Sequence, residues 1–259
     1  MNRLLLWLLL VAPLAGAQIN ETLGDNSGDT YTGSTATNIF ETNPDTVQTT
    51  GPDIGKYETG GFRMGLIVFT GIDSLPNDIT VSAATLNAYL TDGEGGTHTF
   101  TAYRLLVDVD YTDPTWNEYD ADGNLTWTTA GGTSSGNDRS ATVTGTSESI
   151  GVTTGQYYEL IQDSAQLRTD IENMAAGTVP NYGWHFERTD SEDDGTYRVF
   201  APEDGTDGQR PYLDITYTVN GASALPIIHQ QVFIDSAFDS STDAANDAVY
   251  EQRIAVNAR

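Results

Sequence analysis

Residues 212–219 read YLDITYTV, and apolar side chains occupy every second position of this stretch. Leu213, Ile215, Tyr217 and Val219 alternate with residues that are mostly polar. Successive side chains of a β-strand point to opposite faces. The pattern therefore predicts a strand that buries one face in a core.

Similar runs occur throughout the chain and are separated by turn sequences. Residues 86–90 and 100–105 also alternate, whereas 62–69 (FRMGLIVF) is apolar on nearly both faces. Pro, Asn, Asp and Gly cluster between such runs, at 75–78, 92–96, 121–124 and 193–195. Because no long helical patterns alternate with these strands, the sequence predicts an all-β fold, an antiparallel β-sandwich of one domain.

One segment departs from the strand pattern. A stripe at spacings of three or four residues comprises Leu160, Ser164, Leu167, Ile171 and Met174. This spacing is typical of one face of a helix. We therefore expect one short helix over 163–176, with Asp163 as its N-cap and Gly177 just beyond its C-terminus. The helix is expected to pack across the open end or the edge of the sandwich.

The two ends of the chain differ from this body. Residues 1–17 combine a positive start, an apolar run at 4–11 and an Ala-Gly-Ala ending, which is typical of a secretory signal peptide. The run is shorter than the roughly 20 residues that span a bilayer. We therefore expect a secreted or cell-surface protein without membrane insertion. The sandwich is assigned to 18–219, and 220–259 are expected to be a linker and C-terminal tail that could hold a surface or self-assembly partner.

The composition excludes several kinds of function. The chain has 259 residues, with 37 Asp and Glu against 11 Lys and Arg, and a formal net charge of −26. A protein with so much negative charge repels the phosphate backbones of nucleic acids, so no nucleic-acid partner is expected. The absence of Cys excludes disulfides, thiolate zinc ligands and Cys nucleophiles. The three histidines stand in no G-x-S-x-G or H-E-x-x-H motif, so we predict that the protein is not an enzyme.

Several motifs occur in the order of a known family. They include RMGLIVF at 63–69, SAATLNAYL at 82–90, TWN at 115–117 and RPYLDITY at 210–217. The chain resembles the DNRLRE family, also described as carbohydrate-binding module family 96, from about Asp25 to Val219. It departs from the family's R-x-L-L-R-F strand, because Ile67 or Val68 replaces the second arginine. The resemblance implies a secreted, jelly-roll-like β-sandwich that binds carbohydrate, notably acidic polysaccharide such as alginate.

Sugar binding needs flat aromatic faces with polar groups around them. The predicted stacking residues are Tyr119, Tyr182 and Trp184. Trp116 and Trp127 are further candidates, but packing in the core is the favoured alternative for that pair. Arginine forks would receive an anionic sugar, and the candidates are Arg63, Arg104, Arg188 and Arg198. The alternative for each arginine is an ion pair with one of the many carboxylates.

A candidate calcium loop follows the TWN motif. Side-chain oxygens alternate along Asp120, Asp122, Asn124 and Thr126, which resembles the first part of a calcium-binding loop. The loop lacks the glutamate that completes such a site, so an ordinary Asp/Gly turn is the alternative. No cofactor is required by the sequence, and Ca²⁺ is the one candidate.

Two hypotheses for function follow. The leading one is a secreted, non-catalytic polysaccharide-binding module that uses aromatic stacking and arginine hydrogen bonds. The alternative is a structural or adhesive protein, associated with a surface or a virion, that assembles through residues 220–259.

Overall fold

The structure is a computed structural model, which describes residues 16–24, 33–48, 51–57, 61–188, 195–202, 205–206 and 208–220. These residues belong to one compact unit that ends at Ala224. Most of the expected signal peptide, residues 25–32 at the start of the DNRLRE-like stretch and the tail beyond residue 220 lie outside the described residues. They stay predictions.

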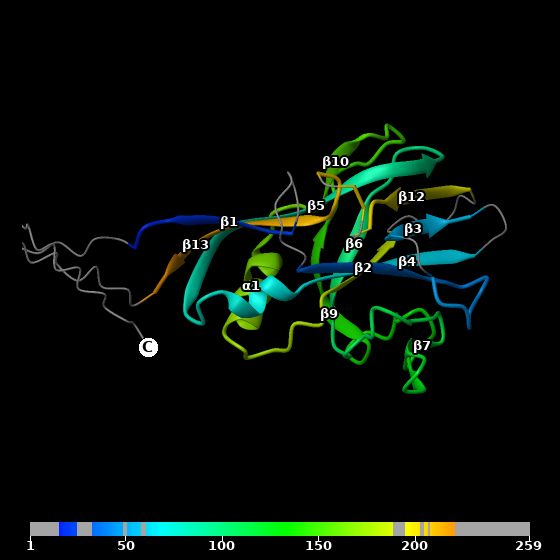
Figure 1. The fold of residues 1–259 in the computed structure, drawn as a ribbon, viewed down its shortest axis with the longest axis horizontal. Helices are drawn as coiled ribbons and strands as arrows, with labels where there is room; N and C mark the ends of the chain where they lie inside the picture. Colours follow the sequence, from blue (N-terminus) through cyan, green and yellow to red (C-terminus); the bar gives the residue numbers. More distant parts are fainter. Residues whose placement is uncertain are drawn as a thin grey trace, which may run out of the picture. The chain divides into compact units, whose positions relative to one another are not determined.

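The described chain is dominated by antiparallel strands, and the all-β expectation is confirmed. One 11-stranded sheet has the order β1-β13-β5-β12-β3-β4-β11-β6-β9, with β10 added to β5 and β2 added to β4. Figure 1 shows that this sheet is curled rather than flat. Its strands are β1 (Ile19–Gly24), β2 (Ser34–Phe40), β3 (Asp53–Lys56), β4 (Phe62–Phe69), β5 (Ile79–Glu94), β6 (Phe100–Leu105), β9 (Arg139–Thr146), β10 (Gln156–Ile161), β11 (Trp184–Arg188), β12 (Thr196–Phe200) and β13 (Tyr212–Val219).

The smaller elements complete the fold. A two-stranded hairpin is formed by β7 (Glu118–Asp120) and β8 (Leu125–Thr126). A short 3₁₀ helix, η1 (Thr70–Ser74), follows β4, and the one α-helix of the described residues is α1 (Ala165–Ala175).

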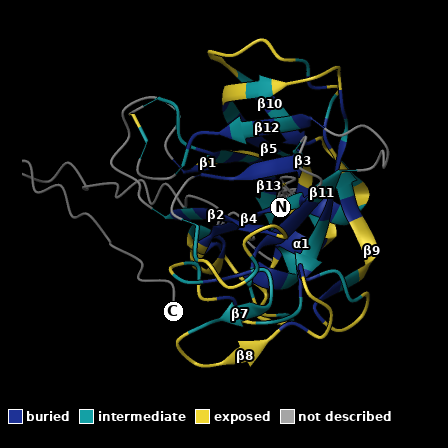
Figure 2. Cartoon of the chain, turned by 90° about the vertical axis from the view of Figure 1, so that its right-hand side faces the viewer, coloured by how far each residue is buried: buried dark blue, intermediate teal, exposed yellow. Residues whose placement is uncertain are grey.

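The main core lies on the inner face of the curled sheet. The alternation at 212–219 is confirmed, because Leu213, Ile215 and Tyr217 are buried and belong to this core. The same core contains the buried residues Leu86, Ala88 and Leu90 of the long strand β5, which pairs with β13. Burial of such side chains is the dominant stabilising contribution in a protein without disulfides. Figure 2 shows buried residues along the strands and exposed residues at β8.

The predicted helix is present, and its N-cap lies one residue later in the sequence than predicted. Ser164 is the N-cap, and its Oγ accepts a hydrogen bond from the Leu167 N–H at 3.0 Å. Asp163 is not the cap, because its Oδ1 accepts from the Ala84 N–H of β5 at 3.0 Å. Gly177 follows the helix with a φ of 66°, as expected for a C-terminal glycine.

The helix closes an edge of β5, in agreement with its expected place. Over residues 81–84 strand β5 pairs with β13 on one side only, and helix side chains take the place of a strand on the other. Glu172 accepts from the Val81 N–H at 2.8 Å, and Arg168 donates to the Ser82 carbonyl at 3.0 Å. The apolar stripe of the helix enters the main core. The sheet edge is thus covered and its backbone groups are satisfied.

A second, smaller core lies on the opposite face of β4. Residues 106–138 leave the sheet after β6, include the β7–β8 hairpin and return at β9. They cover Met64 and Leu66 of β4, and contribute Val109 and Trp127 to the cluster. This covering segment is the layer that carries the candidate sites.

Candidate functional site

A groove opens at the border between the covering segment and the sheet. It has a volume of about 310 Å³ and is called here the Trp116 groove. Its lining comes from three distant stretches of sequence: Phe62 and Met64 of β4, Trp116, Ala130 and Thr133 of the covering segment, and Glu187 and Arg188 of β11. Trp116 and Phe62 are half-buried, so they pack on the second core and still present surface to the groove.

The floor of the groove holds a fixed carboxylate. Glu187 Oε1 lies 3.0 Å from Nη1 of Arg139, and the Arg139 guanidinium lies 3.7 Å above the ring of Tyr103. Burial, followed by the nearby Glu187 carboxylate, raises the pKa of the Tyr103 phenol. Because Glu187 is held by an ion pair, it offers an acceptor of defined position to a ligand hydroxyl.

Cations gather around this groove although the chain is strongly acidic. Arg188 lines it and donates a hydrogen bond to the Thr196 hydroxyl. The Lys56 ammonium lies 5.3 Å from the centre of the Phe62 ring. Together with Arg139, these are three of the eleven Lys and Arg residues in the chain. Glu187 lies among them and pairs with Arg139, so the groove brings together charges of both signs.

Two of the predicted ligand-binding residues are core residues. Trp184 is 0% exposed and shares the inner face of β11 with Phe186, so the expectation that it presents its ring to a ligand is wrong. Arg198 is also 0% exposed. It donates to backbone carbonyls of Glu94, Gly96, Ile150 and Tyr197, so its guanidinium joins strands rather than receiving an anionic sugar.

Two further arginines pair with carboxylates, as the alternative reading of the sequence expected. Arg63 forms an ion pair with the buried Asp53. Its guanidinium lies between the rings of Phe40 and Tyr57, at 3.6 and 3.4 Å from their centres. Arg104 lies 3.6 Å from Asp170 of α1, which also accepts a hydrogen bond from Thr144 at 2.7 Å. Both arginines therefore have structural partners and neither lines the groove.

The predicted tyrosines support the second core. Tyr119 packs edge-to-face on Trp127, with ring centres 5.5 Å apart. The carbonyl oxygen of Tyr182 accepts from the Tyr111 hydroxyl at 2.9 Å. Both are half-buried and do not line the groove. Trp127 is 5% exposed, which confirms its expected place in a core. Of the predicted carbohydrate-binding residues, only Arg188 lies at the groove.

Sequence reasoning missed most of the groove. Trp116 was weighed as a stacking residue but expected to lie in a core, whereas it is only half-buried. Phe62 and Glu187 belong to strands β4 and β11. The alternation of apolar and polar residues in a strand does not show which end of that strand the covering segment leaves exposed. The one sequence signal for this site was the TWN motif itself, since it places an aromatic residue in a segment rich in turns.

The predicted calcium loop is a tight turn between β7 and β8. Asp120 Oδ1 accepts from the Gly123 N–H at 2.6 Å, and Asn124 has a φ of 54°. Asp122 does not belong to the group of carboxylates that Asp120 joins, and the ligand role of the four loop residues stays a prediction. The turn closes on itself through the Asp120 side chain, as Asp side chains commonly do in such turns.

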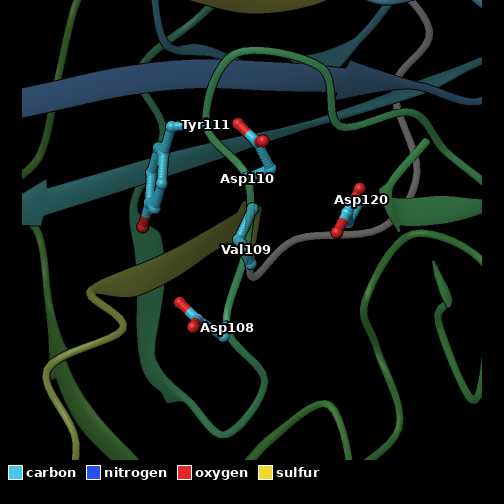
Figure 3. Close-up of a pocket in the computed structure, with 5 residues that line it drawn as sticks. All are labelled: Asp108, Val109, Asp110, Tyr111 and Asp120. Carbon is cyan, nitrogen blue, oxygen red and sulfur yellow. The ribbon is translucent and has the colours of Figure 1, made fainter. Parts of the chain in front are cut away.

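Asp120 instead meets two other carboxylates. One oxygen each of Asp110, Asp113 and Asp120 lie within 4.8 Å of one another. Figure 3 shows the adjoining pocket of about 340 Å³, in which Asp120 lies across from the stretch 108–111. Hydrogen bonds from the hydroxyl and the N–H of Thr112 lower the pKa of Asp110, so its carboxylate is stabilised. Three oxygens of this kind suit a hard cation such as Ca²⁺.

One oxygen in this carboxylate group has no described partner. Asp113 Oδ1 is buried from solvent and has no hydrogen-bond partner among the described residues. Its other oxygen accepts from the Asp122 N–H at 2.7 Å. These are the residues of the described chain that could hold a cation, and calcium binding stays a prediction.

The histidine nearest the groove is a structural residue. His185 is fully buried, and its Nε2 lies 2.9 Å from the Gly131 carbonyl oxygen. Burial, followed by the positive charge of Arg139, lowers the pKa of His185 to about 4. The imidazole is therefore neutral at neutral pH and lies behind the groove wall rather than inside the groove.

In the part of the chain that the structure describes, no helix is both long and apolar enough to cross a membrane. A scan against models of protein families and a search of curated proteins find no match to this chain.

Proposed function

We propose that this protein is a non-catalytic polysaccharide-binding protein and that the Trp116 groove is its ligand site. The observation that supports this most is the pair of half-buried rings, Trp116 and Phe62, beside Glu187 and Arg188. A pyranose ring has an apolar C–H face and a rim of hydroxyls. It matches a site with an aromatic plate and a few placed polar groups.

The size and shape of the groove suit a short stretch of a polymer. Its volume of about 310 Å³ is at the small end of ligand pockets, which measure about 300–1,000 Å³. A sugar unit would stack on the Trp116 indole, and its hydroxyls would donate to the fixed Glu187 carboxylate. The neighbouring units of the chain would continue past the rim of the groove.

The charges favour an acidic glycan such as alginate. Lys56, Arg139 and Arg188 gather at the groove in a chain whose formal net charge is −26. A sugar carboxylate is repelled by most of such a chain, so we expect it to bind where these cations lie. Arg188 lines the groove, and a guanidinium group is the side chain that matches carboxylate geometry best. The resemblance to the DNRLRE family implies the same class of ligand, and the signal-like residues 1–17 support secretion.

Affinity electrophoresis of the full chain tests this proposal. Gels containing alginate, polygalacturonate, xylan or no polymer are run with the wild type, Trp116→Ala and Tyr212→Ala. Tyr212 is the matched control, because it is a half-buried aromatic residue that does not line the groove. We expect alginate or polygalacturonate to retard the wild type and Tyr212→Ala, and Trp116→Ala to migrate as in the polymer-free gel.

Two results would count against the proposal. Equal retardation of wild type and Trp116→Ala would place binding elsewhere on the molecule. No retardation in any gel would favour the structural or adhesive alternative, which depends on residues 220–259, nearly all of them outside the described chain.

A further inference from the structure

The wall of the groove behind Trp116 is a turn, residues 128–134, that is tied down by a buried carboxylate. Asp138 is 0% exposed. It accepts three backbone hydrogen bonds, from Thr128 N–H at 2.8 Å, Thr129 N–H at 3.0 Å and Ser134 N–H at 3.2 Å. A buried carboxylate that is satisfied by backbone donors fixes the path of those donors.

A second tie holds the centre of the turn. The Gly131 carbonyl lies 2.9 Å from His185 Nε2. Because a carbonyl oxygen only accepts, Nε2 carries the proton. The imidazole belongs to strand β11, so this bond joins the turn directly to the sheet.

The indole of Trp116 lies directly on this turn. The Gly131 N–H donates to the Trp116 carbonyl at 2.6 Å. A Cβ atom at Gly131 would lie 2.7 Å from Cη2 and 2.8 Å from Cζ2 of the indole. Since a real Cβ does not approach ring atoms so closely, no residue with a side chain fits there while the indole keeps its position. Gly131 also has a φ of 82°, a conformation that favours glycine.

We propose that Gly131 is a positioning residue for ligand binding: it fixes the Trp116 indole against the wall of the groove before any ligand arrives. This inference rests on the proposed function, and it adds how the stacking residue is held. A ring that is already ordered loses little conformational freedom when a sugar stacks on it. Releasing the ring should therefore weaken binding by roughly 2- to 13-fold, from the typical cost of ordering one side chain.

The test compares Gly131→Ala with Gly136→Ala in the full chain. Gly136 has a φ of 80°, nearly equal to that of Gly131, but a Cβ there meets no atom within 4 Å. Both variants carry the strain of a side chain at positive φ. Only Gly131→Ala displaces the indole, so the difference between the two variants isolates that displacement.

The first readout needs no ligand. Acrylamide quenching of tryptophan fluorescence is measured for each variant, and a Trp116→Phe protein supplies the background of the other tryptophans. We expect Gly131→Ala to raise the quenching of Trp116, and Gly136→Ala to match the wild type. If Gly131→Ala fails to fold, Thr129→Gly is measured instead. It keeps the backbone bonds of the turn but loosens it, and a smaller rise in quenching is expected.

The second readout is retardation by the polymer that retards the wild type. We expect Gly131→Ala to bind roughly 2- to 13-fold more weakly than Gly136→Ala. Equal behaviour of the two variants in quenching and retardation would overturn the positioning role. If no polymer retards the wild type, the proposed function fails. The quenching then still decides whether Gly131 sets the position of the indole.

Discussion

The buried carboxylate of Asp53 predicts an unusual dependence of stability on pH. Asp53 is 1% exposed, and burial raises its pKa from 3.8 to about 6 even though it pairs with Arg63. The folded chain therefore takes up a proton at a higher pH than the unfolded chain does. Stability falls as pH rises through this interval, because the folded state must then hold an ionised, desolvated carboxylate.

The expected size follows from the shift. The difference between about 6 and 3.8 corresponds to about 3 kcal/mol, at 1.36 kcal/mol per pKa unit. The contribution of Asp53 to the free energy of unfolding should therefore become about 3 kcal/mol more favourable as pH falls from above 7 to below 4. Other carboxylates also titrate in this range, so the wild type alone cannot report on Asp53.

The assay is urea unfolding of the wild type and Asp53→Asn at several pH values from 4 to 7.5. Asn cannot titrate, so the difference in unfolding free energy between the two proteins isolates Asp53. We expect the free energy of unfolding of the wild type to rise relative to that of Asp53→Asn as pH falls. A constant difference for Asp53→Asn, or a gain on raising the pH, would refute the reasoning. It would show that Arg63 outweighs desolvation.

Three more predictions follow from the same contacts. Glu172→Ala removes the acceptor of the Val81 N–H and should lower the free energy of unfolding by about 1–3 kcal/mol, measured by urea unfolding; an unchanged value would contradict the edge-closing role of α1. Calcium at a hundred times its dissociation constant should stabilise the wild type by about 2.7 kcal/mol and leave Asp113→Asn unchanged, read from thermal unfolding with calcium or chelator; equal shifts would exclude the three-carboxylate group. Deleting 221–259 should leave polymer binding intact, and loss of retardation would move the ligand site to the tail.

The strands were predictable because their pattern is local. The alternation at 212–219 shows which side chains share a face, and the helical spacing over 164–174 shows where the one α-helix of the described residues lies. Leu160, the first residue of the predicted stripe, belongs instead to strand β10. The N-cap was missed by one residue because Asp163 is engaged by Ala84, which is 79 positions away in sequence. A single sequence carries no signal for such a partner.

The ligand site was less predictable for two physical reasons. Strand alternation does not tell which face is inward, and Trp184 and Arg198 lie on the inner faces of β11 and β12. The Trp116 groove also combines β4, the covering segment and the end of β11. The groove lies at the border of the covering segment on the sheet. The position of that border depends on how the second core packs.

The most direct test of the account is isothermal titration of the full chain with alginate fragments, compared between the wild type and Trp116→Ala. We predict saturable binding by the wild type. The affinity of Trp116→Ala should be lower by a factor of about ten or more, which is a loss of about 1.4 kcal/mol or more in binding free energy. Circular dichroism of the two proteins should agree, because Trp116 is only half-buried. Equal affinities would contradict the assignment of the groove, and no heat of binding with the wild type would contradict alginate as its ligand.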